Sequence, residues 1–359
     1  RAVLGLEQNP LLRSHAATTL ARLHASGREA WRAATQPDVA RALLAVETNS
    51  ESPPDVCASA LLALGHAATS GLDTTLDRTI LAELEARAQN AVPLPTRGFA
   101  RIALARLGAS ASNEVAPAVL ARVAARLCES ITTDDPAGVA WAALASGVLA
   151  RGREARCFAA HAELLEALRE RFRVEREERS AGALAIALGL FRDRESASAV
   201  LERHSEARDE RLRGDCATAL ALMGAREAAD PLRAALARSL YRPDELARTA
   251  EALRRLGDED APEILVELLA GSRGLATQAA LSVALARTGD PRAVPALAAL
   301  LEDGSKTVKA RSFAAFSLGL LLDPRPMPWN AALALDANPF VASPGLYDPT
   351  TGSGALDRL

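Results

Sequence analysis

Aromatic residues, lysine and closely spaced cysteines are scarce in this chain of 359 residues. Aromatics make up 3% of the sequence and lysine occurs at only two positions, whereas hydrophobic residues of all kinds make up 49%. The core must therefore be filled by alanine, leucine and valine, whose small side chains let helices pack closely. No two of the four cysteines (Cys57, Cys128, Cys157 and Cys216) form a C-x-x-C pair. We expect buried, reduced thiols rather than a disulfide framework.

Long apolar runs and an excess of positive charge are also missing. No stretch of about 18 apolar residues is free of charges, so the sequence predicts no membrane span. The net charge of −3 disfavours nucleic acid as a partner, because proteins that bind a duplex usually carry a basic stripe. The chain opens without a signal peptide, which favours the cytoplasm. It begins at Arg1 rather than methionine, so the cell envelope is the alternative if a leader was removed.

The motifs of common catalytic sites are absent. The sequence contains no H-E-x-x-H, G-x-S-x-G or G-x-G-x-x-G, and the stretch 304–307 lacks the earlier glycine and the strand of a phosphate loop. Two H-x-E pairs occur, His161 with Glu163 and His204 with Glu206. Residues two apart point about 200° away from each other on a helix, so neither pair can easily share a metal ion. We therefore expect no catalysis, no cofactor and no metal.

The sequence does contain a short motif that recurs along the chain. The form A-L-x-x-L-G ends at Gly65, Gly108, Gly224 and Gly257, and a related segment reaches Gly289. From Arg192 onward the steps between corresponding positions are 32, 33, 32 and 33 residues. Self-similarity at such a period is typical of stacked supersecondary repeats, so we expect one continuous array.

Each repeat has the pattern of a helix, a short turn and a second helix. In 291–322, Val294, Leu297 and Leu301 form one apolar stripe, which predicts an amphipathic first helix. The second helix is expected over about 307–322, with Ala310, Ala314, Leu318 and Leu321 facing inward. The glycine that closes each phrase is expected to end the second helix in the left-handed conformation. The fold class is therefore all-α, built from stacked antiparallel helix pairs.

These repeats resemble HEAT repeats, especially the short bacterial kind first recognised in phycobilin lyases. The resemblance covers about residues 10–323. It rests on the phased glycines, on proline early in the first helix (Pro117, Pro231, Pro262 and Pro295) and on the arginines at 97, 213 and 311. It implies a right-handed α-solenoid of about eight or nine repeats over 1–323. The repeats are longer over about 1–192 and regular, at 32 to 33 residues, over 193–323.

Two segments depart from the repeat pattern. The charged run 169–179 is expected to be the solvated end of a long helix. The tail 324–359 is irregular, and it contains Trp329 and Phe340. The open end of a solenoid exposes apolar surface, so we expect this tail to be an irregular C-terminal cap. A linker is the alternative.

The function favoured by these observations is that of a non-catalytic scaffold, a monomer that binds a protein or peptide on a concave face lined by the second helices. An alternative implied by the resemblance is a phycobilin-lyase-like enzyme or chaperone acting on a chromophore-carrying protein. A metal-dependent hydroxylase is the third. The candidate contact residues, each of which could instead be an ordinary solvated side chain, are Arg97, Arg101, Arg213, Arg248, Glu251, Arg254, Gln278 and Arg311.

Overall fold

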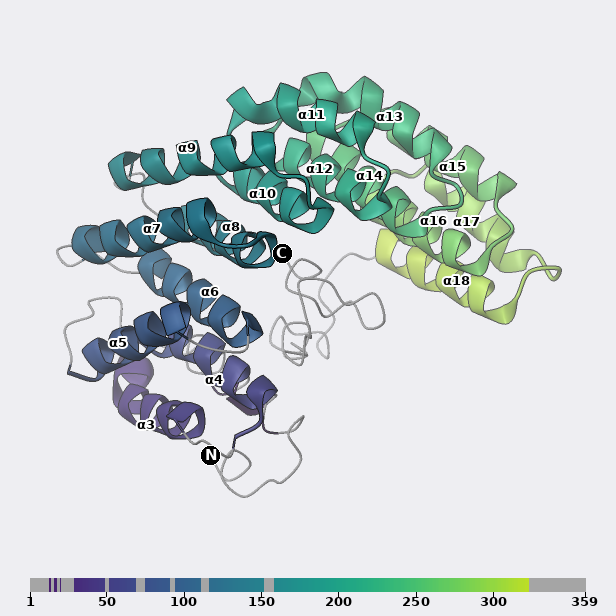
Figure 1. The fold of residues 1–359 in the computed structure, drawn as a ribbon. Coiled ribbons are helices and arrows are strands. Elements are labelled where there is room, and N and C mark those ends of the chain that lie inside the picture. Colours follow the sequence, from purple (N-terminus) through teal and green to yellow (C-terminus); the bar gives the residue numbers. More distant parts are fainter. Residues whose placement is uncertain are drawn as a thin grey trace. The chain divides into compact units, whose positions relative to one another are not determined.

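The computed structural model describes residues 13, 16, 17, 20, 29–48, 52–68, 75–90, 94–110, 116–151 and 158–322. Every regular element in these ranges is a helix, and none of them contains a strand (Figure 1). The chain divides into two compact units. Unit 1 holds the described residues up to Glu175, and unit 2 holds those from Arg176 onward. The all-helical prediction is confirmed.

Unit 1 consists of helices that pack on their neighbours in chain order. Helices α4, α6 and α8 lie side by side, and α3, α5 and α7 each pack on the helix that follows. The helices are α3 (Glu29–Thr48), α4 (Pro54–Ala67), α5 (Thr75–Asn90), α6 (Leu94–Ser110), α7 (Ala116–Thr133), α8 (Pro136–Ala150) and α9 (Phe158–Val174).

Unit 2 continues the helical pattern with shorter connections. Its even-numbered helices stack on one another, and each odd-numbered helix from α11 onward packs on the next even one (Figure 1). The helices are α10 (Glu178–Leu190), α11 (Ala197–Glu206), α12 (Glu210–Met223), α13 (Ala229–Arg238), α14 (Pro243–Leu256), α15 (Ala261–Gly271), α16 (Leu275–Thr288), α17 (Ala293–Glu302) and α18 (Val308–Leu322). This sequential packing is consistent with an α-solenoid.

The glycine prediction is confirmed in unit 2 and wrong in unit 1. Gly224, Gly257 and Gly289 end α12, α14 and α16 with φ of 69°, 75° and 70°. Gly65 and Gly108 instead lie inside α4 and α6, without a positive φ. At Gly65 a Cβ atom would lie 2.9 Å from the Cα atom of Ala103, so this glycine allows α4 and α6 to approach closely.

The core of both units is rich in alanine and leucine. In α10 every residue from Ser180 to Gly189 is buried, which small side chains make possible between two helical neighbours. Trp141 is a packing anchor, with its ring centroid 5.0 Å from that of Phe99. In α18, Ala310 and Ala314 are buried as expected, whereas Leu318 and Leu321 are only half-buried.

The charged run 169–179 does not belong to one helix. Helix α9 ends at Val174 and α10 begins at Glu178. Between them Glu175 is buried, and its carboxylate accepts a hydrogen bond from Arg171 Nε at 3.0 Å. The run therefore joins two helices. The proposed cap 324–359, with Trp329 and Phe340, lies outside the described residues.

The thiols follow the prediction in part. Cys57, Cys128 and Cys216 are free, but only Cys216 is buried, while the other two are half-buried. Cys157 lies outside the described residues. Within the described part of the chain, no helix is long and apolar enough to cross a membrane.

Candidate functional site

Two of the predicted contact residues are buried inside the helical stack. The Arg101 guanidinium in α6 donates to Asp134 Oδ2 at 2.7 Å and to the Gly138 carbonyl at 3.1 Å. The Gln278 amide in α16 donates to the Ser272 carbonyl at 3.1 Å. Buried polar groups must find partners, so these side chains serve the fold rather than an external surface.

Two further candidates, Arg213 and Arg248, form a ladder of ion pairs between α12 and α14. Arg213 Nη2 lies 2.7 Å from Glu245 Oε2, and Arg248 Nη1 lies 2.6 Å from Asp215 Oδ1. Both carboxylates are buried. A buried carboxylate without its partner would destabilise the fold. Both arginines therefore stabilise the packing of neighbouring repeats and do not serve an external surface.

Arg97 and Arg311 are also directed into the structure. Arg97 is half-buried, and its Nε atom is buried without a hydrogen-bond partner. Arg311 Nε donates to the Leu301 carbonyl at 2.7 Å and thereby joins α18 to α17. Of the eight predicted residues, the remaining two, Glu251 and Arg254, line an open groove.

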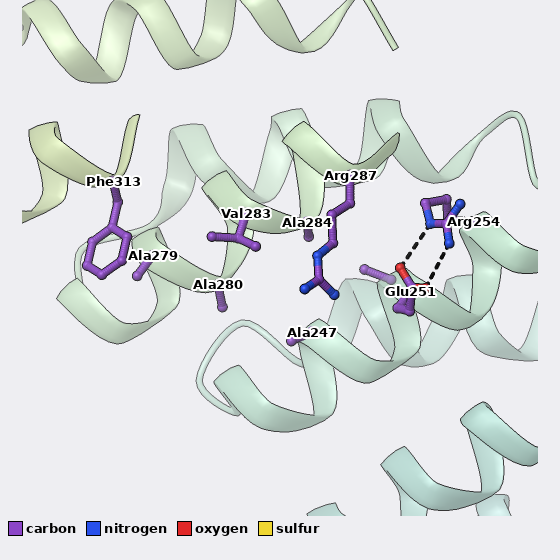
Figure 2. Close-up of a pocket in the computed structure, with 10 residues that line it drawn as sticks. Ala247, Glu251, Arg254, Ala279, Ala280, Val283, Ala284, Arg287 and Phe313 are labelled. Atoms are coloured by element: carbon purple, nitrogen blue, oxygen red, sulfur yellow. Dashed lines mark hydrogen bonds and ion pairs between the residues drawn. The ribbon is translucent and has the colours of Figure 1, made fainter. Parts of the chain in front are cut away.

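This groove lies on the even-numbered helices of unit 2 and has a volume of about 330 Å³ (Figure 2). We call it the α14–α16–α18 groove. Its floor is formed mainly by alanine, with charged side chains toward one end and an aromatic ring at the other. The lining residues are Ala247, Ala250, Glu251, Arg254, Ala279, Ala280, Val283, Ala284, Arg287 and Phe313.

Two of the three charges in the groove neutralise each other. Arg254 Nε and Nη2 donate to the two oxygens of Glu251 at 2.9 and 2.8 Å. The hydrogen bonds from Arg254, with a further one from Arg255, lower the pKa of Glu251 to about 2. Arg287 makes no hydrogen bond or ion pair within the part of the chain that the structure describes. Figure 2 shows its side chain extending into the groove between Ala280 and Glu251, so the groove carries one uncompensated positive charge.

A second hollow, of about 260 Å³, lies in unit 1 between α5, α6 and α7. Its charges are engaged with one another or with adjacent residues. Arg101 pairs with Asp134, Glu85 with Arg122, and Arg126 with Glu129. The unit 1 hollow therefore offers less unsatisfied charge to a ligand than the α14–α16–α18 groove does.

The two H-x-E pairs do not come together as metal ligands. His204 is buried, and burial lowers its pKa, whereas Glu206 is exposed. His161 is half-buried, again with a pKa lowered by burial, and Glu163 is exposed. No group of three or more His, Cys, Asp or Glu side chains is arranged to hold a metal ion among the described residues.

Arg287 and Phe313 complete the groove, and neither residue was predicted from the sequence. Arg287 stands two residues before the helix-ending Gly289, which is the position that Arg255 holds before Gly257. The recurrence of arginine at this position of the repeat could have marked Arg287 as a candidate contact residue in the sequence. No comparable signal marks Phe313, because the alanines of the groove floor look the same in sequence as the alanines of the core.

No family model matches the chain, and no curated protein sequence matches it.

Proposed function

We propose that this protein is a non-catalytic scaffold that binds a segment of another protein on its second-helix face, in the α14–α16–α18 groove. The observation that carries the proposal is the open alanine floor bordered by Phe313 and the uncompensated Arg287. Small side chains let a bound backbone approach closely, and a guanidinium fixes a carboxylate with directed hydrogen bonds. Apolar walls with a few placed polar groups are typical of binding sites.

The titratable groups of the groove favour binding over acid–base chemistry. A general base works best with a pKa near the operating pH. Among the described residues, Glu251 is the only carboxylate that lines the groove, and its pKa is about 2 because Arg254 and Arg255 hold it ionised. Such a carboxylate is a weak base at neutral pH, so its role in the proposal is to orient Arg254.

The same proposal includes the finer architecture. We infer a right-handed, HEAT-like solenoid of about eight or nine helix pairs over 1–323, with a monomeric chain and the tail 324–359 as its cap. The face of the even-numbered helices would then be the concave surface along which a partner runs. The sequential stacking of α10, α12, α14, α16 and α18 supports this arrangement.

The test compares two alanine-to-glutamate variants in the full chain. Ala280→Glu places a bulky charge on the groove floor, and Ala237→Glu places the same group on the exposed side of α13. A photoreactive residue at Val283 would capture whatever segment occupies the groove. We expect a partner protein to cross-link to the Ala237→Glu protein as to the wild type, and to be lost with Ala280→Glu.

Circular dichroism of both variants is the check that each of them still folds. Cross-linking to the same partner at equal yield in both variants would show that the groove does not hold it. Failure to cross-link any partner at all would also count against a scaffold that uses this surface.

A further inference from the structure

The charged end of the α14–α16–α18 groove holds more positive than negative charge. Both oxygens of Glu251 accept hydrogen bonds from Arg254, at 2.8 and 2.9 Å, and Oε1 accepts a further one from Arg255 Nε at 2.9 Å. Two guanidinium groups thus share one carboxylate. Arg287 adds a third guanidinium, for which the described part of the chain supplies no counter-charge. A hollow with an excess of one sign of charge attracts groups of the opposite sign.

The opposite end of the groove is apolar. Glu251 in α14, Val283 in α16 and Phe316 in α18 follow one another at steps of 32 and 33 residues, so they hold the same position in three successive repeats. Phe316 is 62% exposed, and Phe313, which lines the groove, is 39% exposed. Residues three apart are neighbours on a helix surface, so these two rings lie next to each other. The inner face therefore changes from charged on α14 to aromatic on α18.

The separation of the two ends is that of a short extended segment. Figure 2 shows Phe313 at one end and Arg287 reaching toward the other, with Ala279 and Ala280 between them. Helix α18 packs on α16, and packed helices lie about 8–10 Å apart. An extended segment advances about 3.3 Å per residue, so groups that meet Arg287 and Phe313 would stand about three to five residues apart.

Building on the proposed scaffold function, we propose that the segment bound in this groove is an extended peptide with an acidic residue at one end and a large apolar residue at the other. The aspartate or glutamate carboxylate pairs with Arg287, and the apolar side chain packs on Phe313 and Phe316. The backbone between them crosses the alanine floor. A neutral or basic segment would cover Arg287 without supplying a counter-charge, so Arg287 selects the partner by its charge.

The first test selects peptides from a phage-displayed random library on the full-length protein. Wild type should enrich peptides with aspartate or glutamate about three to five residues from an aromatic or large aliphatic residue. Arg287→Glu should instead enrich lysine or arginine at the acidic position. Arg273→Glu is the matched control, because Arg273 is exposed and lies outside the groove, and it should select as wild type does. An acidic preference that persists in Arg287→Glu, or no such preference in wild type, would overturn the proposal.

The second test measures the pairing itself with one selected peptide and fluorescence anisotropy. Replacing the acidic residue of the peptide by its amide should weaken binding to wild type about tenfold, the change expected for one charge-assisted hydrogen bond. In Arg287→Gln the same replacement should have little effect, whereas in the control Arg273→Gln the tenfold loss should remain. An equal loss in all three proteins would show that the carboxylate binds elsewhere.

The apolar end has its own control. Phe313→Ala should weaken binding of the peptide about three- to tenfold, because part of a buried aromatic contact is lost. Val308→Ala removes an exposed apolar side chain from the same helix outside the groove and should leave binding unchanged. Equal affinities of wild type and Phe313→Ala would remove the apolar anchor from the proposal.

The two proposals fail in different ways. If Ala280→Glu abolishes binding of the selected peptides but these peptides share no acidic residue, the groove is a binding site and only the charge selection is wrong. If Ala280→Glu leaves their binding unchanged, or if no peptide is selected, both the groove and the partner assigned to it are wrong.

Discussion

At the scale of single residues, the helix ends of unit 2 share one backbone requirement. Gly224, Gly257 and Gly289 all adopt a left-handed conformation, and Arg192 adopts it after α10 with φ of 57°. A side chain in this region costs about 1–2 kcal/mol. The repeat geometry thus imposes the turn even where the sequence does not supply glycine.

Replacing Arg192 with glycine should stabilise the protein. We expect a gain of about 0.5–1 kcal/mol in the free energy of unfolding, because relief of the strained φ outweighs the greater flexibility of glycine in the unfolded chain. Gly257→Ala should lower the free energy of unfolding by about 1 kcal/mol, because its φ is 75°. A Cβ there meets no atom within 4 Å, so the loss would come from the backbone conformation alone. Urea titration followed by circular dichroism measures both. A loss of stability in Arg192→Gly would show that the arginine side chain contributes more than the turn costs.

A second residue of interest is Glu47, a buried carboxylate in unit 1. Its Oε1 atom lies 2.6 Å from Arg87 Nε, and the same nitrogen lies 2.9 Å from Glu83 Oε1. One guanidinium therefore serves two carboxylates. Burial, with the contribution of Glu83, raises the pKa of Glu47 to about 7, and Arg87 only partly opposes the rise.

This raised pKa predicts that stability depends on pH. Between about pH 4.5 and 7, folded Glu47 keeps a proton that the unfolded chain has lost, so stability falls as the pH rises through this range. Glu47→Gln should remove much of the dependence, while the exposed control Glu129→Gln should retain it. The midpoint of urea denaturation at about pH 5 and about pH 7.5 provides the measurement. An unchanged dependence in Glu47→Gln would assign it to other groups.

At the scale of helices, buried glycines determine how closely the even-numbered helices pack. Gly65 of α4 faces the Ala103 backbone of α6, and Gly189 of α10 faces the Ala219 backbone of α12. Gly98 of α6 lies beneath the Trp141 ring of α8, where a Cβ would clash with the ring. Each contact joins adjacent repeats.

Adding a methyl group at such a crossing should separate two helices. We expect Gly65→Ala to destabilise the protein by about 1–3 kcal/mol, because its Cβ would lie 2.8 Å from the Ala103 carbonyl oxygen and backbone cannot move aside as a side chain can. Gly271→Ala in α15 is the matched control, since its Cβ meets nothing within 4 Å. Differential scanning calorimetry compares the two. Equal melting temperatures would show that α4 can shift without penalty.

At the scale of the whole molecule, stability arises from contacts between neighbours in the chain. Within unit 2, helix packing and ion pairs such as Arg213 with Glu245 join adjacent repeats. Such a stack has no central element on which all the others depend. Stability is then close to a sum of repeat and interface contributions.

Deleting one whole repeat should therefore leave a folded protein. Removal of 257–288 takes out α15 and α16 and joins α14 to α17 in register, so we expect the helical signal per residue to persist at a lower melting temperature. Removal of 257–272 deletes α15 alone and leaves α16 where an odd-numbered helix belongs. Circular dichroism should show that this shorter deletion is the more damaging. Loss of most helical signal in the 257–288 deletion would contradict the solenoid architecture.

The sequence by itself determined the helices, their pairing in order and the glycine turns at positions 224, 257 and 289, because these depend on local periodicity and backbone conformation. Only the tertiary structure decided that Gly65 and Gly108 lie within helices, because that depends on how closely a second helix approaches. The tertiary structure also distinguished two kinds of polar residue. Arg101, Arg213 and Gln278 form hydrogen bonds or ion pairs within the helical stack, whereas Arg287 extends into the groove. Arginine and alanine serve the interior and the surface of this protein alike, so the surroundings of each side chain, rather than its type, determine its role.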